Sequence, residues 1–297
     1  MAGWHIGVIG GSGLYEAGAL DDAQQIAVAS PFGEPSGPVT MGTLEGVRFT
    51  FLARHGAGHR LPPSAINYRA NIDVLKRCGV SDVLAVSAIG SLREQLAPGH
   101  FVVPDQFIDR TEGRARSFFG AGLTAHVSLA DPVCPRLAAA AAAAAKAAGA
   151  KVHRGGCYVA IEGPQFSTRA ESELYRQWGA DVIGMTAMPE ARLAREAELP
   201  YAVLAMVTDY DCWRVDEKGR GEAVEAAQVL AVMHANVERA RAALVRLARA
   251  LPEERAPSPI DRALDGAIMT PPAQWDGHVA RRLDAVAARY LASLSDG

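Results

Sequence analysis

The chain has 297 residues, of which 49% are hydrophobic and 21% are charged, and its formal net charge is -3. This composition is typical of a folded globular protein and excludes a disordered one. Without a basic cluster to neutralise phosphates, we expect no nucleic-acid partner. No apolar stretch approaches the roughly 20 residues that span a bilayer, so we also expect no membrane partner.

The cysteines and the N-terminal segment indicate the compartment. The four cysteines, at positions 78, 134, 157 and 212, fit neither a disulfide framework nor CxxC metal spacing. No pair of His or Cys residues shows the spacing of zinc ligands. The first residues, Met1 to Ile6, lack the charged and apolar regions of a secretory signal. We therefore expect a reduced, cytoplasmic protein without a metal site.

Short apolar runs alternate along the chain with segments of helical periodicity. We predict strands at 6–9, 47–53, 82–87, 100–103, 158–161, 181–185 and 201–207, and helices at 64–78, 132–148, 168–178, 189–197, 222–251 and 275–293. Ser64 and Thr168 are the predicted N-caps of two of these helices. The alternation predicts an α/β fold, a single domain with a central mixed β-sheet flanked by helices.

A proline-rich break at residues 252–259 divides this domain into two parts. Residues 1–251 carry the strands and most of the helices. Residues 252–297 carry one predicted amphipathic helix, which we interpret as a C-terminal helical extension of the same domain.

A glycine turn, Gly10 to Gly13, follows the first predicted strand. The dinucleotide pattern G-x-G-x-x-G fails because Glu16 stands where the third glycine belongs, and no Gly-Lys-Ser/Thr is present. The backbone N–H groups and the hydroxyl of Ser12 could hold a small anion. A tight turn without a ligand explains the glycines equally well.

Arg54 and His55 follow the strand at 47–53. A guanidinium offers a planar fork to oxyanions and an imidazole can donate one further hydrogen bond, although an internal ion pair is the alternative for the arginine. Ser87 and Thr186 add hydroxyl groups at the ends of two other strands. Because ligands collect at the carboxyl ends of parallel strands, these residues predict a site for free phosphate.

Three further residues have both a structural and a functional interpretation. Phe166 could be a core residue or the face on which a flat base stacks. Met185 could fill the core or form a soft surface under a sugar. His126, in a loop before the alanine-rich helix, has the pattern of an ordinary surface residue.

Two carboxylates, Asp209 and Asp211, follow the last predicted strand. If the strand continues through them, their side chains project to the same side. Like charges in a poorly solvated site raise the pKa of one carboxyl, which can then donate a proton near neutral pH. A protonated carboxyl beside an ionised one complements adenine, which offers a ring-nitrogen acceptor next to an amine donor. An exposed turn with no ligand is the alternative.

An anion site, an apolar middle and a purine-matched acid pair together predict one reaction, the phosphorolysis of a purine nucleoside. Inorganic phosphate is then a co-substrate, and the reaction requires no organic cofactor and no metal.

Eight blocks of sequence strengthen this prediction. On them the chain resembles the 5′-methylthioadenosine phosphorylases, the trimeric branch of the purine nucleoside phosphorylase superfamily. The resemblance extends from Gly7 to about Ala250, beginning with the glycine turn, and its other blocks are 54–56, 67–71, 88–94, 105–111, 161–167, 185–186 and 208–213.

The resemblance implies the phosphorylase fold, with a partly barrel-like sheet, and a set of site residues. The phosphate site would comprise Ser12, Arg54, His55, Ser87, Ala88 (through its backbone) and Thr186. The nucleoside site would comprise Met185 under the ribose, Phe166 against the base, Asp209 as the general acid that protonates the imidazole ring of adenine, and Asp211 on the exocyclic amine.

The resemblance also implies a homotrimer. His126 matches a position that reaches the 5′ group of a neighbouring subunit's ligand, and the C-terminal extension matches a segment that closes that pocket, with Leu291 as a wall residue. The expected activity converts 5′-methylthioadenosine and phosphate to adenine and 5-methylthioribose 1-phosphate. The alternatives are a phosphorylase for 6-oxopurine nucleosides such as methylthioinosine or for 5′-deoxyadenosine, a hydrolase, and a nucleoside-binding protein without catalysis.

Overall fold

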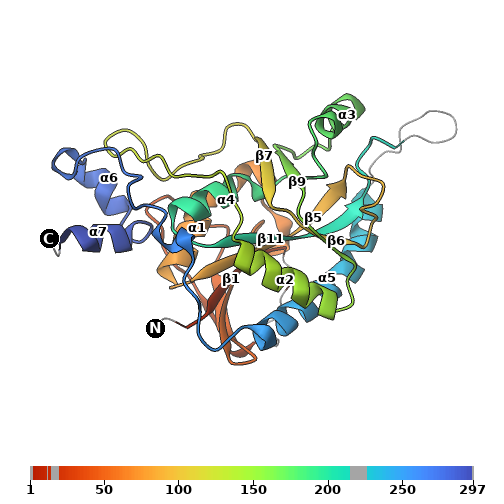
Figure 1. Ribbon diagram of the computed structural model, residues 1–297, viewed down its shortest axis with the longest axis horizontal. Coiled ribbons are helices and arrows are strands. Elements are labelled where there is room, and N and C mark those ends of the chain that lie inside the picture. The colour runs from red at the N-terminus through yellow and green to blue at the C-terminus, as the bar shows by residue number, and fades with distance from the viewer. Residues whose placement is uncertain (1–2, 12, 15–19, 215–225, 296–297) are drawn as a thin grey trace.

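The computed structural model of the protein describes residues 3–11, 13–14, 20–214 and 226–295. These residues form a mixed α/β fold around an 11-stranded sheet (Figure 1). Its strands are β1 (His5–Gly10), β2 (Asp21–Ile26), β3 (Val39–Leu44), β4 (Val47–Ala53), β5 (Asp82–Ser91), β6 (Phe101–Val103), β7 (Gln106–Arg110), β8 (Val152–Arg154), β9 (Cys157–Ile161), β10 (Val182–Gly184) and β11 (Tyr201–Asp209).

The strand order is β2-β3-β4-β1-β5-β10-β9-β7, with β11 paired to β5 and β6, and β8 paired to β6. Strands β4, β1, β5 and β11 run parallel to one another. Strand β5 pairs with β11, β11 with β6 and β6 with β8, and β5 also pairs with β10, which pairs with β9. Because β8 continues into β9 through Gly155 and Gly156, these pairings close into a circuit. The mixed and partly barrel-like sheet is therefore as predicted.

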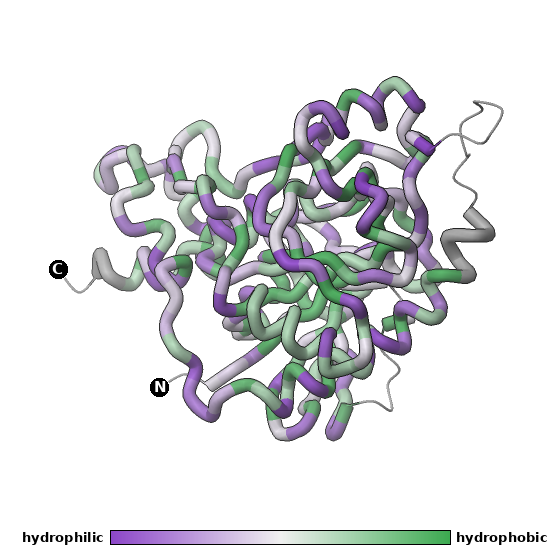
Figure 2. The backbone as a smooth tube through the Cα atoms, turned by 45° about the vertical axis from the view of Figure 1, so that its right-hand side comes forward, coloured by the Kyte–Doolittle hydropathy of each residue, from purple (hydrophilic) through white to green (hydrophobic). Residues whose placement is uncertain are grey.

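Alternate side chains of β11 enter two different cores. Val203, Ala205 and Val207 pack in the core that contains buried residues of α1 (Tyr68–Arg77) and α4 (Ala187–Glu196). Ala202, Leu204 and Met206 pack in the core that contains α2 (Pro135–Ala147) and α5 (Ala226–Ala250). Helices thus cover both faces of this strand, and Figure 2 shows the hydrophobic segments gathered in the interior.

All seven predicted strands are present, but four strands were not predicted. Strand β2 is exposed at each of its six positions and carries the sequence DDAQQI, so hydrophobicity does not mark it. It forms through antiparallel pairing with β3, which in turn pairs with β4. Strands β7 and β8 are likewise short and incompletely buried.

Two N-cap predictions have different outcomes. Thr168 caps α3 (Arg169–Gln177) through a complete capping box with Glu171, as predicted. Ser64 does not cap α1, because residues Pro63–Ala65 form a separate 3₁₀ turn. The N-cap is Asn67, whose side chain accepts a hydrogen bond from the N–H of Ala70.

The prediction of one C-terminal helix at 275–293 is wrong. The structure contains two helices, α6 (Gly277–Arg282) and α7 (Ala288–Ser295), preceded by a 3₁₀ turn at Pro272–Gln274. Between the helices, the side chain of Asp284 accepts the N–H of Ala285 and pairs with Arg77, which gives the backbone an alternative to helical bonding.

The extension nevertheless shares the core of the domain. Leu264, Leu283, Val286 and Ala287 are buried in the same cluster as α1 and α4. No helix among the described residues is long and apolar enough to cross a membrane.

Candidate active site

The carboxyl ends of β1, β4, β5 and β11 lie at one edge of the sheet because these strands are parallel. Arg54 and His55 follow β4, and Asp209 ends β11. Ser87 and Ala88 do not follow β5, as predicted from the sequence, but lie inside it, because pairing with β11 and β10 extends this strand to Ser91.

The acid pair is brought together by a turn. Strand β11 ends at Asp209, and Asp211 has φ +52°, so the expected strand alternation does not apply to Asp211. Instead, the Asp211 N–H donates to Oδ1 of Asp209 over 2.8 Å. Asp211 is only 6% exposed. The two carboxyl groups are therefore neighbours in a site from which water is largely excluded.

Burial gives both acids an increased affinity for protons. It raises the pKa of Asp209, while hydrogen bonds from the Thr208 hydroxyl (2.7 Å) and the Asp211 N–H lower it in part. Burial raises the pKa of Asp211 to about 6, against hydrogen bonds from Ser172 and the Cys212 backbone, and the charge of Asp209 raises it further. Burial thus favours the protonated form of each of the two carboxyl groups.

The turn that carries the acids is fixed to the end of β5. The indole N–H of Trp213 donates to the carbonyl of Ser91 over 2.8 Å, and the guanidinium of Arg176 lies 3.9 Å from the centre of the indole ring. Gly90 leaves room for the pair, since a Cβ there would lie 2.9 Å from Oδ1 of Asp209.

The guanidinium of Arg54 is already occupied by protein groups. Arg54 is 2% exposed, and its Nε and Nη2 donate to the two carboxylate oxygens of Glu190 over 2.9 and 3.0 Å. Nη1 donates to the carbonyl of Val86 and Nη2 to that of Ile9, each over 3.1 Å. The planar fork expected to face an oxyanion faces Glu190 instead. One N–H of Nη1 has no assigned partner among the described residues.

His55 is held as the neutral imidazole. Its Nδ1 lies 2.9 Å from the carbonyl of Leu61, which can only accept, so Nδ1 carries the proton. Burial and the positive charge of Arg54 lower the pKa of His55 to about 4. The ring of His59 stacks on it, with centroids 4.1 Å apart.

Three hydroxyl groups lie between the ends of β5, β9 and β10. The Ser87 and Tyr158 hydroxyls are buried, and neither makes a hydrogen bond of good geometry within the described structure. The two hydroxyls nevertheless lie near each other. Burial raises the pKa of Tyr158, and the Ser87 hydroxyl and the Thr186 backbone lower it in part. Thr186 is the N-cap of α4, but its side chain makes no capping hydrogen bond.

The segments after β9 and β10 carry Phe166 and Met185, the residues expected to contact the base and the ribose. The sulfur of Met185 lies against Gly163, where a Cβ would come within 2.5 Å of it. Buried Arg114 links the two segments, donating to the carbonyls of Met185 (2.7 Å) and Glu162 (2.6 Å). Phe166 is 47% exposed and is therefore not a core residue.

His126 and Leu291 lie away from the acid pair of their own chain. His126 is exposed and its N–H donates to the carbonyl of Ala267 in the C-terminal extension. Helix α7, which carries Leu291, is held by an ion pair from Arg289 to Glu198, just before the amino end of β11. The acids stand at the opposite end of that strand, and Figure 1 shows α6 and α7 at the other side of the molecule from α3.

Ser12, the remaining expected phosphate ligand, lies outside the described residues. Within them, no group of three or more His, Cys, Asp or Glu side chains is arranged to hold a metal ion.

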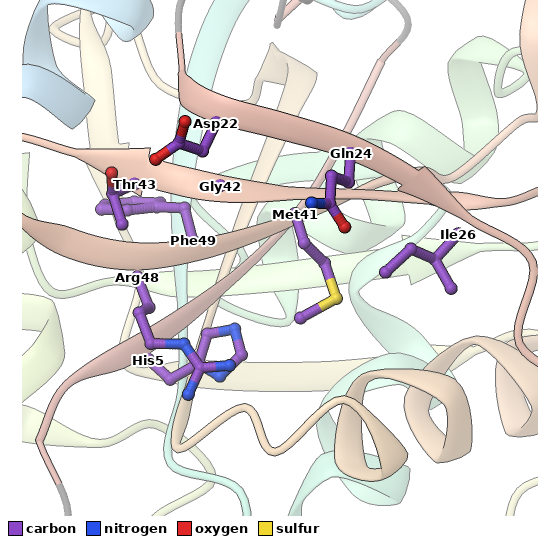
Figure 3. A pocket seen from close by; sticks show the side chains of 9 residues that line it. All are labelled: His5, Asp22, Gln24, Ile26, Met41, Gly42, Thr43, Arg48 and Phe49. Atoms are coloured by element: carbon purple, nitrogen blue, oxygen red, sulfur yellow. The ribbon is translucent and has the colours of Figure 1, made fainter.

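A shallow cavity of about 250 Å³ lies elsewhere, lined by residues of β1 to β4 that include His5, Asp22 and Arg48 (Figure 3). His5 and Arg48 stand at the amino ends of β1 and β4, opposite the edge that carries Arg54 and the acids. The cavity is therefore separate from the site described above.

Four residues of this site were not singled out from the sequence: Arg114, Tyr158, Ser172 and Glu190. Ser172 and Glu190 fall inside predicted helices, where polar residues usually face solvent, yet they are 0% and 1% exposed. The sequence offers a local signal only for Glu190. It follows Thr186, a predicted phosphate ligand, by one helical turn, and residues at this spacing are neighbours on one face of a helix.

The chain is similar to known proteins. Residues 5–249 match the model of the phosphorylase superfamily. The S-methyl-5′-thioadenosine phosphorylases of Bradyrhizobium diazoefficiens and Cereibacter sphaeroides are each 54% identical to the chain, over 96% of it and 98% of the relative.

Solved structures give the same result. A methylthioadenosine phosphorylase from an Antarctic soil metagenomic library has a TM-score of 0.89 at 46% identity, covering 95% of this chain and 98% of its own. The Schistosoma mansoni methylthioadenosine phosphorylase, solved in complex with adenine, has a TM-score of 0.78 at 38% identity, covering 83% and 91%.

Proposed function

Since the chain belongs to the phosphorylase superfamily and, within it, to the S-methyl-5′-thioadenosine phosphorylases, we propose that it cleaves 5′-methylthioadenosine with phosphate to adenine and 5-methylthioribose 1-phosphate. The observation that carries this proposal is the pair of partly buried Asp209 and buried Asp211 at the edge of the sheet where Arg54, His55, Ser87 and Thr186 gather. The bond between C1′ of the sugar and N9 of the base breaks, and a phosphate oxygen takes its place on C1′.

Asp209 acts as the general acid in this proposal. The departing purine accumulates negative charge on its imidazole ring, and that charge raises the proton affinity of the nearest carboxyl group. Asp209 is already disposed to hold a proton because burial raises its pKa. It donates this proton to the ring nitrogen as the glycosidic bond breaks, while Asp211 accepts a hydrogen bond from the exocyclic amine.

Phosphate is held mainly by hydrogen bonds in this proposal. Arg54 contributes its remaining Nη1 hydrogen, and its charge is balanced by Glu190. The hydroxyls of Ser87 and Thr186, the backbone of Ala88, the imidazole of His55 and the expected ligand Ser12 supply the rest. Met185 lies under the ribose and Phe166 faces the base.

The acid pair also sets the preference for 6-aminopurines. An ionised Asp211 would face the oxygen of a 6-oxopurine without a hydrogen between them, and an unpaired buried charge of this kind costs about 2 kcal/mol or more. The preference for methylthioadenosine over methylthioinosine follows from this difference.

A cyclic homotrimer completes the site. Phe166 and, on α3, Leu174 and Trp178 are exposed, at 47%, 41% and 44%. Helices α6 and α7, the second of which carries Leu291, lie at the other side of the molecule from α3 (Figure 1), and the backbone N–H of His126 donates to Ala267 in the same extension. A head-to-tail contact between these two sides gives a ring when the rotation between successive subunits closes after three copies. His126, Leu291 and the extension 252–297 then border the 5′ group of the neighbouring subunit's substrate. A cytoplasmic location agrees with the free thiol state of all four cysteines.

A phosphate-dependence assay tests the proposal. We expect adenine to be released from methylthioadenosine only when phosphate is present, with methylthioinosine a much poorer substrate. In the same assay Asp209→Asn should lower turnover by about 10²-fold or more, the usual contribution of a general acid. Release without phosphate would indicate a hydrolase, and no release under any condition would indicate a binding protein.

A further inference from the structure

Arg114 is a buried arginine in the segment between β7 and α2, and its guanidinium donates to backbone carbonyls around the site. Only 2% of its side chain is exposed. Its Nη1 donates to the carbonyls of Met185 (2.7 Å) and Met188 (2.9 Å), and its Nη2 donates to that of Glu162 (2.6 Å). A buried charge is costly unless its hydrogen bonds are made, and these three carbonyls accept them.

The three carbonyls lie where regular secondary structure is interrupted. Glu162 directly follows β9, and Met185 directly follows β10. Met188 lies near the start of α4, but its backbone is extended (φ −117°, ψ 136°) rather than helical. Neither a sheet ladder nor a regular helix therefore fixes the chain between β10 and the body of α4. Arg114 supplies two contacts to it.

The guanidinium is itself fixed by its surroundings. The hydroxyl of Tyr68, on α1, accepts from Nη1 over 3.0 Å and donates to the carbonyl of Pro63 over 3.1 Å. The carboxylate of Glu162 forms an ion pair with Nε at 3.0 Å. Arg114 is thus held against α1 and the end of β9, and it can fix the position of the chain after β10.

The carbonyl of Met185 belongs to the peptide bond that joins Met185 to Thr186. In the proposed function Met185 lies under the ribose and Thr186 offers its hydroxyl to phosphate. Because a peptide bond is planar, a hydrogen bond to its carbonyl fixes the orientation of the whole unit. The sulfur of Met185 is held from another side by Gly163, where a Cβ would come within 2.5 Å of it.

We propose that Arg114 is a positioning residue, which fixes the peptide bond between Met185 and Thr186 and thereby aligns the ribose with phosphate. This inference rests on the proposed function of the site. Arg114 acts through these two residues and does not touch the reactants. The acids that bind the purine are fixed by other contacts, such as that of the Asp211 N–H with Asp209. Arg114 therefore affects the chemical step and not the binding of adenine.

The test compares the unaltered protein with Arg114→Lys, which keeps the charge but replaces the planar fork with a single ammonium group. The measurement is the rate of adenine release in a single turnover, with enzyme in excess over methylthioadenosine and with saturating phosphate. We expect this rate to fall about tenfold to a hundredfold, because misplacement by about 1 Å has effects of this size. The inhibition constant of adenine should stay unchanged.

Arg255→Lys is the matched control. The side chain of Arg255 is also largely buried, at 10% exposed, but it pairs with Asp82 at the amino end of β5 and with Asp261 in the C-terminal extension. This variant should melt at a lower temperature without a change in the single-turnover rate. An equal fall in rate in both variants would mean that loss of any buried arginine slows the reaction, which would overturn the inference.

Tyr68→Phe serves as a second variant if Arg114→Lys does not fold. It removes one contact of the guanidinium but keeps the aromatic ring and the charge of Arg114. Loss of one hydrogen bond should lower the single-turnover rate about fivefold, again with the inhibition constant of adenine unchanged. A rate equal to that of the unaltered protein would contradict the proposed role.

The outcomes are distinguishable from failure of the proposed function. If the unaltered protein releases no adenine from methylthioadenosine with phosphate, the function itself is wrong. If it does, and folded Arg114→Lys reacts at the same rate, Arg114 does not position the reactants. A slower rate with an equal loss of adenine binding would show a general distortion of the site and would also reject the inference.

Discussion

Glu190 reaches the guanidinium of Arg54 with both carboxylate oxygens, and the hydroxyl of Tyr201 donates to one of them over 2.8 Å. Burial alone would lower the pKa of Arg54, but the charge and hydrogen bonds of Glu190 more than offset this effect and raise it. The arginine is thus permanently charged and fixed in orientation. We infer that Glu190 positions the single N–H that Arg54 offers to phosphate.

Replacing Glu190 with Gln should therefore weaken phosphate binding. The amide keeps the size of the side chain but removes the charge, which leaves a buried guanidinium unpaired at a cost of about 3 kcal/mol in folding stability. We expect KM for phosphate to rise about tenfold while kcat changes less. Steady-state kinetics with phosphate varied, together with thermal melting, measure both effects.

Glu196→Gln is the matched control on the same helix. Glu196 is a largely buried carboxylate that accepts from the Ser117 hydroxyl and the Phe118 N–H, and burial raises its pKa to about 7, but it does not contact Arg54. Its replacement should leave KM for phosphate unchanged. A similar rise in both variants would mean that loss of a buried acid, rather than release of Arg54, weakens phosphate binding.

Sequence patterns predict which residue types gather here but not how they bond. Asp209 and Asp211 were found because two acids directly follow an apolar run. For Arg54 the sequence left an internal ion pair open as an alternative but could not identify the partner, since Glu190 lies 136 residues away and pairs with it only in the folded chain. The left-handed backbone of Asp211 was missed for the same reason, because contacts with the end of β5, such as that of Trp213 with Ser91, fix the turn.

At the scale of elements, the acid pair packs against the end of β5, next to the end of β11. The two strands pair in parallel up to Asp209 and Gly90, with an irregularity between Val207 and Asp209. A Cβ on Gly90 would meet Oδ1 of Asp209 at 2.9 Å and a methyl carbon of Ile183 at 3.0 Å. This strand position therefore needs glycine for space, not for backbone freedom.

Gly90→Ala should displace the carboxylate of Asp209 and lower kcat/KM for methylthioadenosine by about tenfold to a hundredfold, because misplacement of a catalytic group by about 1 Å has effects of this size. Gly120→Ala is the control, since a Cβ there meets nothing within 4 Å. Measuring kcat/KM for methylthioadenosine in both variants tests this prediction. Normal activity of Gly90→Ala would show that the space between residue 90 and the Asp209 carboxylate tolerates a methyl group.

Elements were predictable where one chain segment carries its own signal. The apolar strands and the capping box of α3 are local patterns. Strand β2 was missed because it depends on pairing with β3, and the C-terminal helix was predicted as continuous because the bond from Arg77 to Asp284, 207 residues apart, is invisible in a local pattern.

At the scale of the whole molecule, the residues of the proposed site lie in two regions. Phe166 and the exposed Leu174 and Trp178 belong to the loop and to helix α3 that follow β9. Figure 1 shows helices α6 and α7 at the other side of the molecule from α3, and the backbone N–H of His126 donates to Ala267 in the same C-terminal extension. The homotrimer proposed above would bring the two regions of neighbouring subunits together and would cover the exposed side chains of α3.

The most direct measurement is a crystal structure of the protein with methylthioadenosine and sulfate, which stands in for phosphate without permitting the reaction. We expect the purine edge within hydrogen-bond distance of Asp209 and Asp211, and the sulfate beside Arg54, His55 and Thr186. The 5′ methylthio group should meet His126 and Leu291 of a neighbouring subunit. A base bound elsewhere, with both carboxyl groups facing bulk water, would contradict the account.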